Sequence, residues 1–312
     1  MGDTVSIIAP NTRAMYEAHF AIPMAGAVIN AINIRLDPKT ISYILTHSDS
    51  KLIFSDTEFL PVIKKAFKIG KHKIPIIYID DSKEFSKNIK GDTSYEEFLK
   101  TGKLEDVNMD LIIKDEWFPI SLGYTSGTTG KPKGVVTHHR GAYLNAISNQ
   151  LIWHMKKNPV YLWTLPMFHC NGWCFPWTIA ALAGTNICLR KVNTKKILKL
   201  IKKYNVSNLC GTTVIINMLI EANIKINHTV DFMTGAAPPP VSILKKIEEM
   251  NFKITHTYGL TEVYGPAVVC EWQKEWDKIK KKNTIAELKS RQGVKCYGIK
   301  DLKVINQKTK KI

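Results

Sequence analysis

Short apolar runs alternate with amphipathic segments through the first third of the chain. Runs that are mainly apolar predict buried strands, whereas segments with apolar residues every three or four positions predict helices. The predicted strands cover residues 5–9, 51–54 and 74–79, and the predicted helices cover residues 12–27, 38–48, 58–68 and 95–101. Strands that alternate with helices form mainly parallel sheets with helices on both faces. The pattern therefore predicts an α/β fold.

The alternation continues from residue 117 onward. Further strands are predicted at residues 117–122, 160–165, 186–189, 206–210, 230–234 and 252–257, and further helices at residues 138–153, 173–183, 194–204, 213–222, 241–250 and 272–282. The polar residues 80–91 and 102–110 are expected to be loops. We expect one domain with two sub-sections, at residues 1–115 and 116–270. We expect the start of a β-rich region at residues 290–312, because apolar and charged residues alternate within residues 302–305.

A stretch rich in glycine and hydroxyl groups, YTSGTTGKPKGVV at residues 124–136, lies between a predicted strand and a predicted helix. Glycines let a loop turn its backbone N–H groups toward a ligand, and hydroxyl and ammonium groups add further donors. Such a loop suits a polyphosphate, although its spacing is not that of a Walker A loop. The candidate contacts are Thr125, Ser126, Gly127, Thr128, Thr129, Gly130, Lys131 and Lys133. Composition alone supports a polar turn equally well.

Three later motifs each follow a predicted strand: PMFHCNGW at residues 166–173, GAAPPP at residues 235–240 and YGLTE at residues 258–262. In the last motif Tyr258 could stack on a purine, Thr261 could donate to a phosphate, and Glu262 could hold Mg²⁺, which prefers oxygen ligands. Each motif also has a purely structural explanation. PMFHCNGW could be a turn with a packed histidine, GAAPPP could be a turn, and YGLTE could be a loop with an exposed carboxylate.

The net charge of +17, from 44 basic and 27 acidic residues, raises the question of nucleic-acid binding. The lysines are spread through predicted surface helices, and the sequence contains no zinc-finger spacing, RNP-like aromatic motif or basic-leucine heptad. We therefore expect no nucleic-acid partner. The sequence also lacks an apolar run long enough for a transmembrane helix. The six cysteines lie mostly in apolar runs, and we expect no metal site beside Cys170 and Cys174.

The segment TSGTTGKPKGVV resembles the phosphate-binding signature of the adenylate-forming, or AMP-binding, acyl-CoA synthetase superfamily. The continuation THHRGAYLNA is similar to the plant acyl-activating branch, which includes short-chain acyl-CoA and benzoate–CoA ligase-like proteins. The resemblance covers nearly all of the 312 residues. It implies a partial, large N-terminal adenylation domain of stacked, mainly parallel sheets flanked by helices. It also implies truncation at both ends and absence of the small C-terminal lid domain.

The resemblance assigns roles to the motifs. It implies that His169, Thr261 and Glu262 are catalytic, with His169 near the acyl carboxylate and Glu262 as the Mg²⁺ ligand. It implies nucleotide binding by the loop after residue 124 and by Gly235, Ala236, Ala237, Tyr258, Gly259 and Thr261. Ala236 stands where the family usually has glycine, and this departure is expected to tighten the pocket.

The activity implied by the resemblance is ATP-dependent activation of a carboxylic acid to an acyl-adenylate and then to a thioester of coenzyme A. We expect it to be impaired here, because the family's ribose-binding aspartate, adenylation lysine and lid are missing from this sequence. The alternative is a nucleotide-binding fragment or pseudoenzyme without turnover. Aromatic residues near His169, such as Phe168, Trp173 and Trp177, indicate an apolar acid. The expected compartment is the cytoplasm or the peroxisome, with no targeting signal visible.

Overall fold

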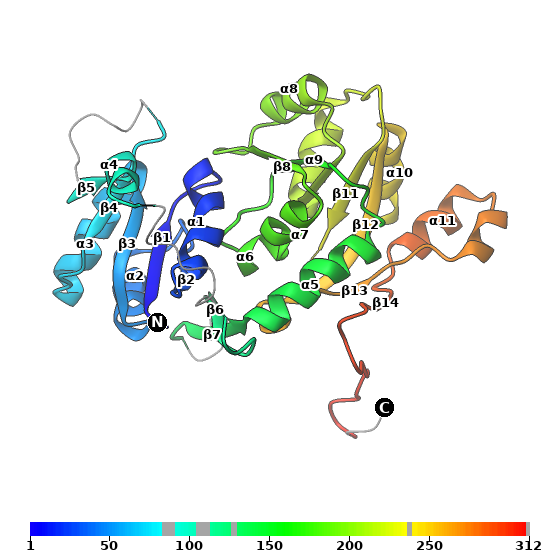
Figure 1. Ribbon diagram of the computed structural model, residues 1–312. Helices are drawn as coiled ribbons and strands as arrows, with labels where there is room; N and C mark the ends of the chain where they lie inside the picture. The colour runs from blue at the N-terminus through cyan, green and yellow to red at the C-terminus, as the bar shows by residue number, and fades with distance from the viewer. Residues whose placement is uncertain (83–90, 104–112, 126–129, 236–238, 310–312) are drawn as a thin grey trace.

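The computed structural model describes residues 1–82, 91–103, 113–125, 130–235 and 239–309 of the chain. Over these residues the chain forms two mixed seven-stranded sheets with helices packed against them, which confirms the predicted α/β fold (Figure 1). The first sheet occupies the blue to teal part of the figure, and the second sheet occupies the green to orange part. In this described part, no helix combines the length and the hydrophobicity that crossing a membrane requires.

In the first sheet the described strands run in the order β5-β4-β3-β1-β2-β6-β7. Neighbouring strands are parallel except for β6 and β7, which form an antiparallel hairpin. The strands are β1 (Thr4–Ile8), β2 (Val28–Ala31), β3 (Ser50–Asp56), β4 (Ile76–Ile79), β5 (Thr93–Ser94), β6 (Pro119–Thr125) and β7 (Lys133–His138). The accompanying helices are α1 (Arg13–Met24), α2 (Pro38–His47), η1 (Thr57–Phe59), α3 (Leu60–Gly70) and α4 (Tyr95–Lys100).

The described strands of the second sheet run in the order β14-β13-β12-β11-β10-β8-β9. The pairs from β9 to β12 are parallel, and β13 and β14 continue the sheet in antiparallel fashion. The strands are β8 (Val160–Trp163), β9 (Thr185–Cys188), β10 (Asn208–Gly211), β11 (Val230–Thr234), β12 (Phe252–Leu260), β13 (Gly265–Val269) and β14 (Val294–Lys295). The helices are α5 (His139–Ile152), α6 (Cys170–Trp173), α7 (Phe175–Ala181), α8 (Thr194–Tyr204), α9 (Thr213–Ala222), α10 (Val241–Glu249), η4 (Thr261–Val263), η5 (Lys274–Lys278) and α11 (Lys282–Lys289).

Helix α8 has the bounds that the sequence predicts, because local signals specify both of its ends. The side chain of Asn193 accepts a hydrogen bond from the backbone N–H of Lys196, which caps the first turn. Asn205 ends the helix in the left-handed conformation, with φ of 50°. Between these ends the apolar residues recur at helical spacing and are buried, while the lysines lie on the outer face.

The main departure from the predicted fold is strand β7. The sequence predicts a loop that runs directly into a helix at residue 138, but β7 first pairs with β6, with Val135 opposite Gly123 and Val136 opposite Leu122. The candidate phosphate loop therefore begins at the end of β6 and its last residues belong to β7, while residues 126–129 lie outside the described residues. The sequence pattern does not predict β7, because the strand begins with lysine and glycine, and both residue types are depleted in strands.

Three other segments also differ from the predicted pattern. Strand β2 was not expected, because its polar Asn30 breaks the apolar run; in the fold Asn30 is buried and donates to the Ser6 hydroxyl at 2.8 Å. The helix predicted at residues 272–282 is replaced by η5 and α11, where the Trp272 indole donates to Asp277 at 2.7 Å. Residues 302–305 form no strand in the described structure.

One buried side chain ties the first sheet to the second. Asn11, in the turn after β1, donates through Nδ2 to the carbonyl oxygens of Trp163 and Leu165, each at 2.9 Å. Its Oδ1 accepts a hydrogen bond from the backbone N–H of Met167 at 2.8 Å. These three bonds hold the segment after β8 against the end of β1. They also fix the start of the motif that carries His169.

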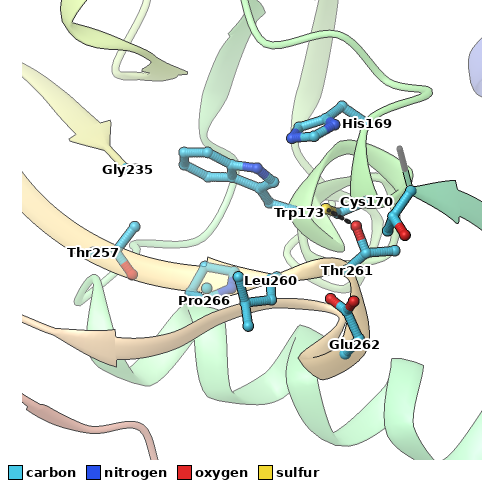
Figure 2. Close-up of a pocket in the computed structure, with 12 residues that line it drawn as sticks. His169, Cys170, Trp173, Gly235, Thr257, Leu260, Thr261, Glu262 and Pro266 are labelled. Atoms are coloured by element: carbon cyan, nitrogen blue, oxygen red, sulfur yellow. Dashed lines mark hydrogen bonds between the residues drawn. The ribbon is translucent and has the colours of Figure 1, made fainter. Parts of the chain in front are cut away.

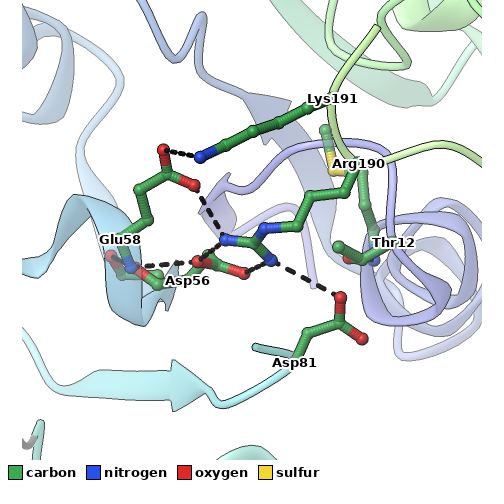
Figure 3. A network of polar contacts seen from close by, with 8 residues as sticks. Thr12, Asp56, Glu58, Asp81, Arg190 and Lys191 are labelled. Atoms are coloured by element: carbon green, nitrogen blue, oxygen red, sulfur yellow. Dashed lines mark hydrogen bonds and ion pairs between the residues drawn. The ribbon is translucent and has the colours of Figure 1, made fainter. Parts of the chain in front are cut away.

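An ion-pair network joins the same two sheets at a second point (Figure 3). Arg190, which follows β9, binds both carboxylate oxygens of Asp56 at 2.6 and 2.7 Å. It also binds Glu58 at 2.9 Å and Asp81 at 3.4 Å. The Asp56 side chain is 0% exposed and lies at the end of β3. A buried carboxylate of this kind requires a cationic partner, because desolvation of an unpaired charge is costly.

Replacing Arg190 with methionine should lower the free energy of unfolding by about 3–5 kcal/mol, because Asp56 would remain buried without its partner. Urea denaturation followed by circular dichroism measures the change. The matched control is Arg13→Met, which removes an exposed ion pair with Glu96 and should cost less than about 1 kcal/mol. Equal effects of the two substitutions would contradict the role assigned to Arg190.

His19 on α1 makes stability depend on pH. Burial lowers the pKa of its imidazole to about 4, although a hydrogen bond to the Met15 carbonyl acts in the opposite direction. Well above pH 6.5 neither the folded nor the unfolded state binds this proton, so the full stability is present. As the pH falls from about 6.5 to about 4, the unfolded state takes up the proton first, and the free energy of unfolding should fall by about 3 kcal/mol.

The contribution of His19 is measured by comparing the pH dependence of unfolding in the native protein and in His19→Gln, whose side chain does not titrate. Between pH 6.5 and pH 4, the free energy of unfolding of the variant should fall by about 3 kcal/mol less than that of the native protein. His154→Gln, at an exposed histidine, is the control and should keep the native dependence on pH. An unchanged profile in His19→Gln would show that the buried imidazole does not cause the effect.

Candidate active site

A cavity of about 300 Å³ lies where the two sheets meet (Figure 2). Strand β6 contributes to it from the first sheet, and the segment after β8, the end of β11 and the β12–β13 connection contribute from the second sheet. Its described lining consists of Thr125, His169, Cys170, Trp173, Gly235, Thr257, Gly259, Leu260, Thr261, Glu262, Gly265 and Pro266. The sequence motifs therefore converge on one pocket, although they lie far apart along the chain.

The turn between β12 and β13 presents Thr261 and Glu262. Its geometry depends on Tyr264, which has φ of 61° and donates its backbone N–H to the Thr261 carbonyl at 3.0 Å. The buried Tyr264 side chain accepts a hydrogen bond from the Ser121 hydroxyl on β6, and the Tyr264 carbonyl accepts one from Asn145 on α5 at 2.7 Å. Both sheets and α5 thus fix the orientation of this turn.

Thr261 lies between the two sheets. Its Oγ1 is 3.2 Å from the Sγ atom of Cys170, and its methyl group lies over Gly123 of β6. Burial raises the pKa of the Cys170 thiol, and the contact with Thr261 only partly offsets this. Cys170 is therefore a neutral thiol at neutral pH. A neutral thiol is a weak nucleophile, so Cys170 contributes packing and a hydrogen bond rather than a reactive thiolate.

His169 reaches the pocket from the segment that Asn11 holds in place. Surrounding protein lowers the pKa of its imidazole by desolvation, and the positive charge of Arg35 lowers it further. The imidazole is therefore neutral at neutral pH. Arg35, in the exposed loop after β2, was not among the residues that the sequence analysis selected. Its place beside His169 depends on the packing of the two sheets, and its local sequence carries no motif that would reveal it.

The segment labelled α6 in Figure 1, directly after His169, is a left-handed turn and not a right-handed helix. Five consecutive residues have positive φ: Cys170 at 43°, Asn171 at 41°, Gly172 at 56°, Trp173 at 56° and Cys174 at 69°. This conformation costs roughly 1–2 kcal/mol for each residue that carries a Cβ atom. Gly172 also leaves room for Trp163, whose ring lies 2.7 Å from where a Cβ would be. The sequence analysis predicts a helix from residue 173, but the helix begins only at Phe175.

Some predicted site residues line this pocket and others do not. Thr125, His169, Gly235, Gly259, Thr261 and Glu262 line it. Tyr258, Gly130, Lys131 and Lys133 are described but are not part of its lining. The Tyr258 residue is 38% exposed, and the Lys131 ammonium lies 5.9 Å from the centre of the Tyr43 ring. Ser126, Gly127, Thr128, Thr129, Ala236 and Ala237 lie outside the described residues.

The described part of the chain contains no cluster of three or more histidine, cysteine, aspartate or glutamate side chains that could hold a metal ion. In the pocket, Glu262 supplies a carboxylate beside the Thr261 hydroxyl. This arrangement does not form a closed metal cage. It can instead supply one oxygen ligand to a cation that takes its remaining ligands from water and from a bound phosphate.

Gly259 permits the close approach of β12 and β13 behind the pocket. A Cβ at this position would lie 1.8 Å from the carbonyl oxygen of Gly265. We therefore expect Gly259→Ala to lower the free energy of unfolding by at least about 1–3 kcal/mol, because the backbone of β13 must move. Urea denaturation midpoints measure the loss.

Gly298→Ala is the control for this substitution, since a Cβ at Gly298 would meet no atom within 4 Å. Its effect should stay within about 0.5 kcal/mol. Unfolding curves for Gly259→Ala that match those of Gly298→Ala would disprove the steric argument.

Comparison with known proteins adds an independent observation. The model of the family described as AMP-binding enzyme matches residues 1–308. The peroxisomal acetate/butyrate–CoA ligase AAE7 of Arabidopsis thaliana is 47% identical over 99% of this chain and 57% of its own length. The peroxisomal trans-cinnamate:CoA ligase of Petunia hybrida is 44% identical over 98% of this chain and 57% of its own length. The chain thus spans little more than half the length of these relatives.

A solved structure also resembles the fold. The o-succinylbenzoate coenzyme A synthetase from Bacillus subtilis, in complex with ATP and magnesium ion, superposes with a TM-score of 0.70. The match covers 88% of this chain and 53% of that protein at 22% identity. At this level of identity the likeness supports the fold and not the chemistry.

Proposed function

The chain belongs to the AMP-binding enzyme family, and from that premise we propose that it activates a carboxylic acid with ATP and transfers the acyl group to coenzyme A. The observation that carries this proposal is the convergence of Thr125, His169, Thr261 and Glu262 on one cavity between the two sheets. The relatives named as CoA ligases support the same activity.

The proposed reaction has two steps. A carboxylate oxygen of the acid attacks the α-phosphorus of ATP, the bond to pyrophosphate breaks, and an acyl-adenylate forms. The sulfur of coenzyme A then attacks the acyl carbonyl, and AMP leaves with the electrons of the broken bond. The first step depends mainly on positioning the reactants and neutralising phosphate charge, since the carboxylate is already ionised at neutral pH.

The residues of the pocket fit these demands. Thr125 and Thr261 would donate hydroxyl hydrogen bonds to phosphate oxygens from opposite sheets. Ser126, Gly127, Thr128, Thr129 and Gly130 would add further donors from the glycine-rich segment. Lys131 and Lys133 would add positive charge near the phosphates. Gly235, Ala236, Ala237, Tyr258 and Gly259 would contact the nucleoside.

Glu262 would bind Mg²⁺ with one carboxylate. Mg²⁺ is commonly held by one or two carboxylates together with substrate phosphates, so an open site with a single acid suits this ion. When bound, Mg²⁺ would neutralise phosphate charge.

His169 would act as a neutral hydrogen-bond donor to the acid or to the α-phosphate. Its lowered pKa favours the neutral imidazole, which can donate through one ring nitrogen without carrying a charge. A general base is not required for an acid that is already ionised. For the compartment we propose the peroxisome, because both relatives described above are named as peroxisomal, with the cytoplasm as the alternative.

The proposal is tested by acid-dependent exchange of pyrophosphate into ATP, measured on the purified chain with Mg²⁺ and acids from acetate to medium-chain and aromatic acids. Glu262→Ala should lower the exchange rate about a hundred- to thousandfold, because one preorganised charge is lost. The matched control is Glu221→Ala, at an exposed glutamate on α9, which should leave the rate unchanged.

Binding of Mg·ATP, measured by calorimetry in parallel, separates the other outcomes. Binding without exchange for any acid would overturn acid activation by this chain and favour a nucleotide-binding protein without turnover. A folded chain that binds neither ATP nor AMP would overturn both acid activation and nucleotide binding without turnover. Equal exchange rates in Glu262→Ala and Glu221→Ala would reject Glu262 as the Mg²⁺ ligand.

A further inference from the structure

We propose that His47 is a positioning residue for ATP. It holds the end of β6, where Thr125 enters the cavity, and it acts together with Tyr43 on the same face of α2. This inference rests on the proposed function, because it concerns how the phosphates of ATP meet the glycine-rich segment. Three observations carry it: the hydrogen bond between His47 and Tyr124, the packing of Tyr124 beside the site, and the contact between Tyr43 and Lys131.

A hydrogen bond joins the last residue of α2 to the end of β6. Nδ1 of His47 lies 2.8 Å from the hydroxyl oxygen of Tyr124, and the two rings meet edge to face with their centres 5.8 Å apart. Burial raises the pKa of the Tyr124 phenol to about 12, so the hydroxyl keeps its proton at neutral pH and can donate a hydrogen bond to Nδ1. Tyr124 directly precedes Thr125, whose hydroxyl we assign to the phosphates. The bond therefore restrains the backbone that presents Thr125.

The ring of Tyr124 is packed beside the candidate active site. It lies against an apolar cluster of the first sheet that includes Ile41 and Ile44 of α2. Across the hairpin Tyr124 pairs with Gly134, and a Cβ on that glycine would lie 3.5 Å from Cζ of the tyrosine, so the ring lies over the backbone of β7. Tyr124 and His169 also line one small cavity of about 40 Å³. Packing thus holds the body of the ring, and α2 holds its hydroxyl end.

The face of α2 that carries His47 also carries Tyr43, because the two residues are four positions apart. Their rings stack with centres 5.4 Å apart and planes inclined by 27°. The ammonium of the exposed Lys131 lies 5.9 Å from the centre of the Tyr43 ring. A cation is attracted to the face of an aromatic ring, and the attraction is weak at an exposed site. Tyr43 therefore keeps Lys131 near α2, while the charge of a bound phosphate can still draw the ammonium away.

The exposure of His47 separates a positioning role from a role in stability. His47 lies exposed at the end of α2, and the Tyr124 ring would keep its apolar contacts without it. Loss of the hydrogen bond should therefore change the stability of the fold little. It would instead leave the end of β6 less restrained. Ordering that end when ATP binds would then lower the affinity for the β- and γ-phosphates.

The test compares the binding of Mg·ATP with the binding of AMP, both measured by calorimetry on the purified chain. AMP lacks the β- and γ-phosphates, which we place at the glycine-rich segment. His47→Ala and Tyr124→Phe should each weaken the binding of Mg·ATP about three- to tenfold, as expected for one hydrogen bond, and should change the binding of AMP less than about twofold. The double variant should bind Mg·ATP no more weakly than either single variant, because both substitutions remove the same contact.

Further variants isolate the contacts of α2. His47→Asn keeps an acceptor close to the position of Nδ1 and should restore the affinity for Mg·ATP to within about twofold of the native value. Tyr43→Leu removes the ring on which His47 stacks and should weaken the binding of Mg·ATP about threefold, whereas Tyr43→Phe keeps the ring and should not. The matched control is His72→Ala, which removes a hydrogen bond of 3.1 Å to Ser42, also on α2, and should leave both affinities unchanged.

The outcomes separate this inference from the proposed function. If the native chain binds Mg·ATP and neither His47→Ala nor Tyr124→Phe weakens that binding, the positioning role is refuted while nucleotide binding stands. Additive losses in the double variant would refute it as well. Equal weakening of Mg·ATP and AMP would refute the link between His47 and the β- and γ-phosphates. A folded native chain that binds neither ATP nor AMP would overturn the proposed function, and this inference with it.

Discussion

The three hydrogen bonds of Asn11 are the constraint on which the site depends. They join the turn after β1 to the segment after β8, and that segment leads directly to His169 and to the left-handed turn. This junction sets the position of the His169 segment relative to the first sheet, while the Ser121–Tyr264 hydrogen bond joins the two sheets at the β12–β13 turn. Asn11 hydrogen-bonds two carbonyl groups and one N–H group of a buried segment, so its replacement would remove three hydrogen bonds at once. The Arg190 network holds the same two sheets at a second, more polar point.

The pocket combines a rigid apolar side with a more open polar side. Trp173 is held by Asn149, by the close approach of Gly265 and by the left-handed turn. Glu262, in contrast, is exposed on a short turn, although Tyr264 anchors that turn from beneath. Phosphates and a metal ion can adjust to a carboxylate that remains accessible to water.

The charge distribution around the pocket is simpler than the net charge of +17 indicates. His169 and Cys170 are both kept neutral, chiefly by desolvation, and Arg35 adds a positive charge beside the histidine. The buried carboxylate of Asp56 is matched by Arg190 in the inter-sheet network. The lysines of α8 lie on the outer face of that helix, away from the pocket. A pocket with neutral donors and a nearby cation is suited to an anionic ligand, for which charge repulsion would otherwise be large.

Much of the fold was determined by the sequence alone. The periodicity of α8 and α9, and the asparagine in the left-handed conformation that ends each of them, act over a few residues, so both helices have their predicted bounds. The motif residues Thr125, His169, Thr261 and Glu262 were also selected from the sequence, and the structure brings them to one cavity. Their roles in catalysis stay a prediction. By contrast, β7 could not be predicted, because its pairing with β6 overrides the weak strand preference of lysine and glycine.

The tertiary structure alone decided the position of Arg35 and the left-handed turn at Trp173. Arg35 acts on His169 only because the first sheet packs beside the second, and no local pattern records that contact. The turn adopts a conformation that its own residues disfavour, and contacts from α5 and β13 hold it there. Local sequence thus determined which chemical groups are available. Their meeting in one cavity depends on contacts between distant segments, whose energies appear only when the chain is folded.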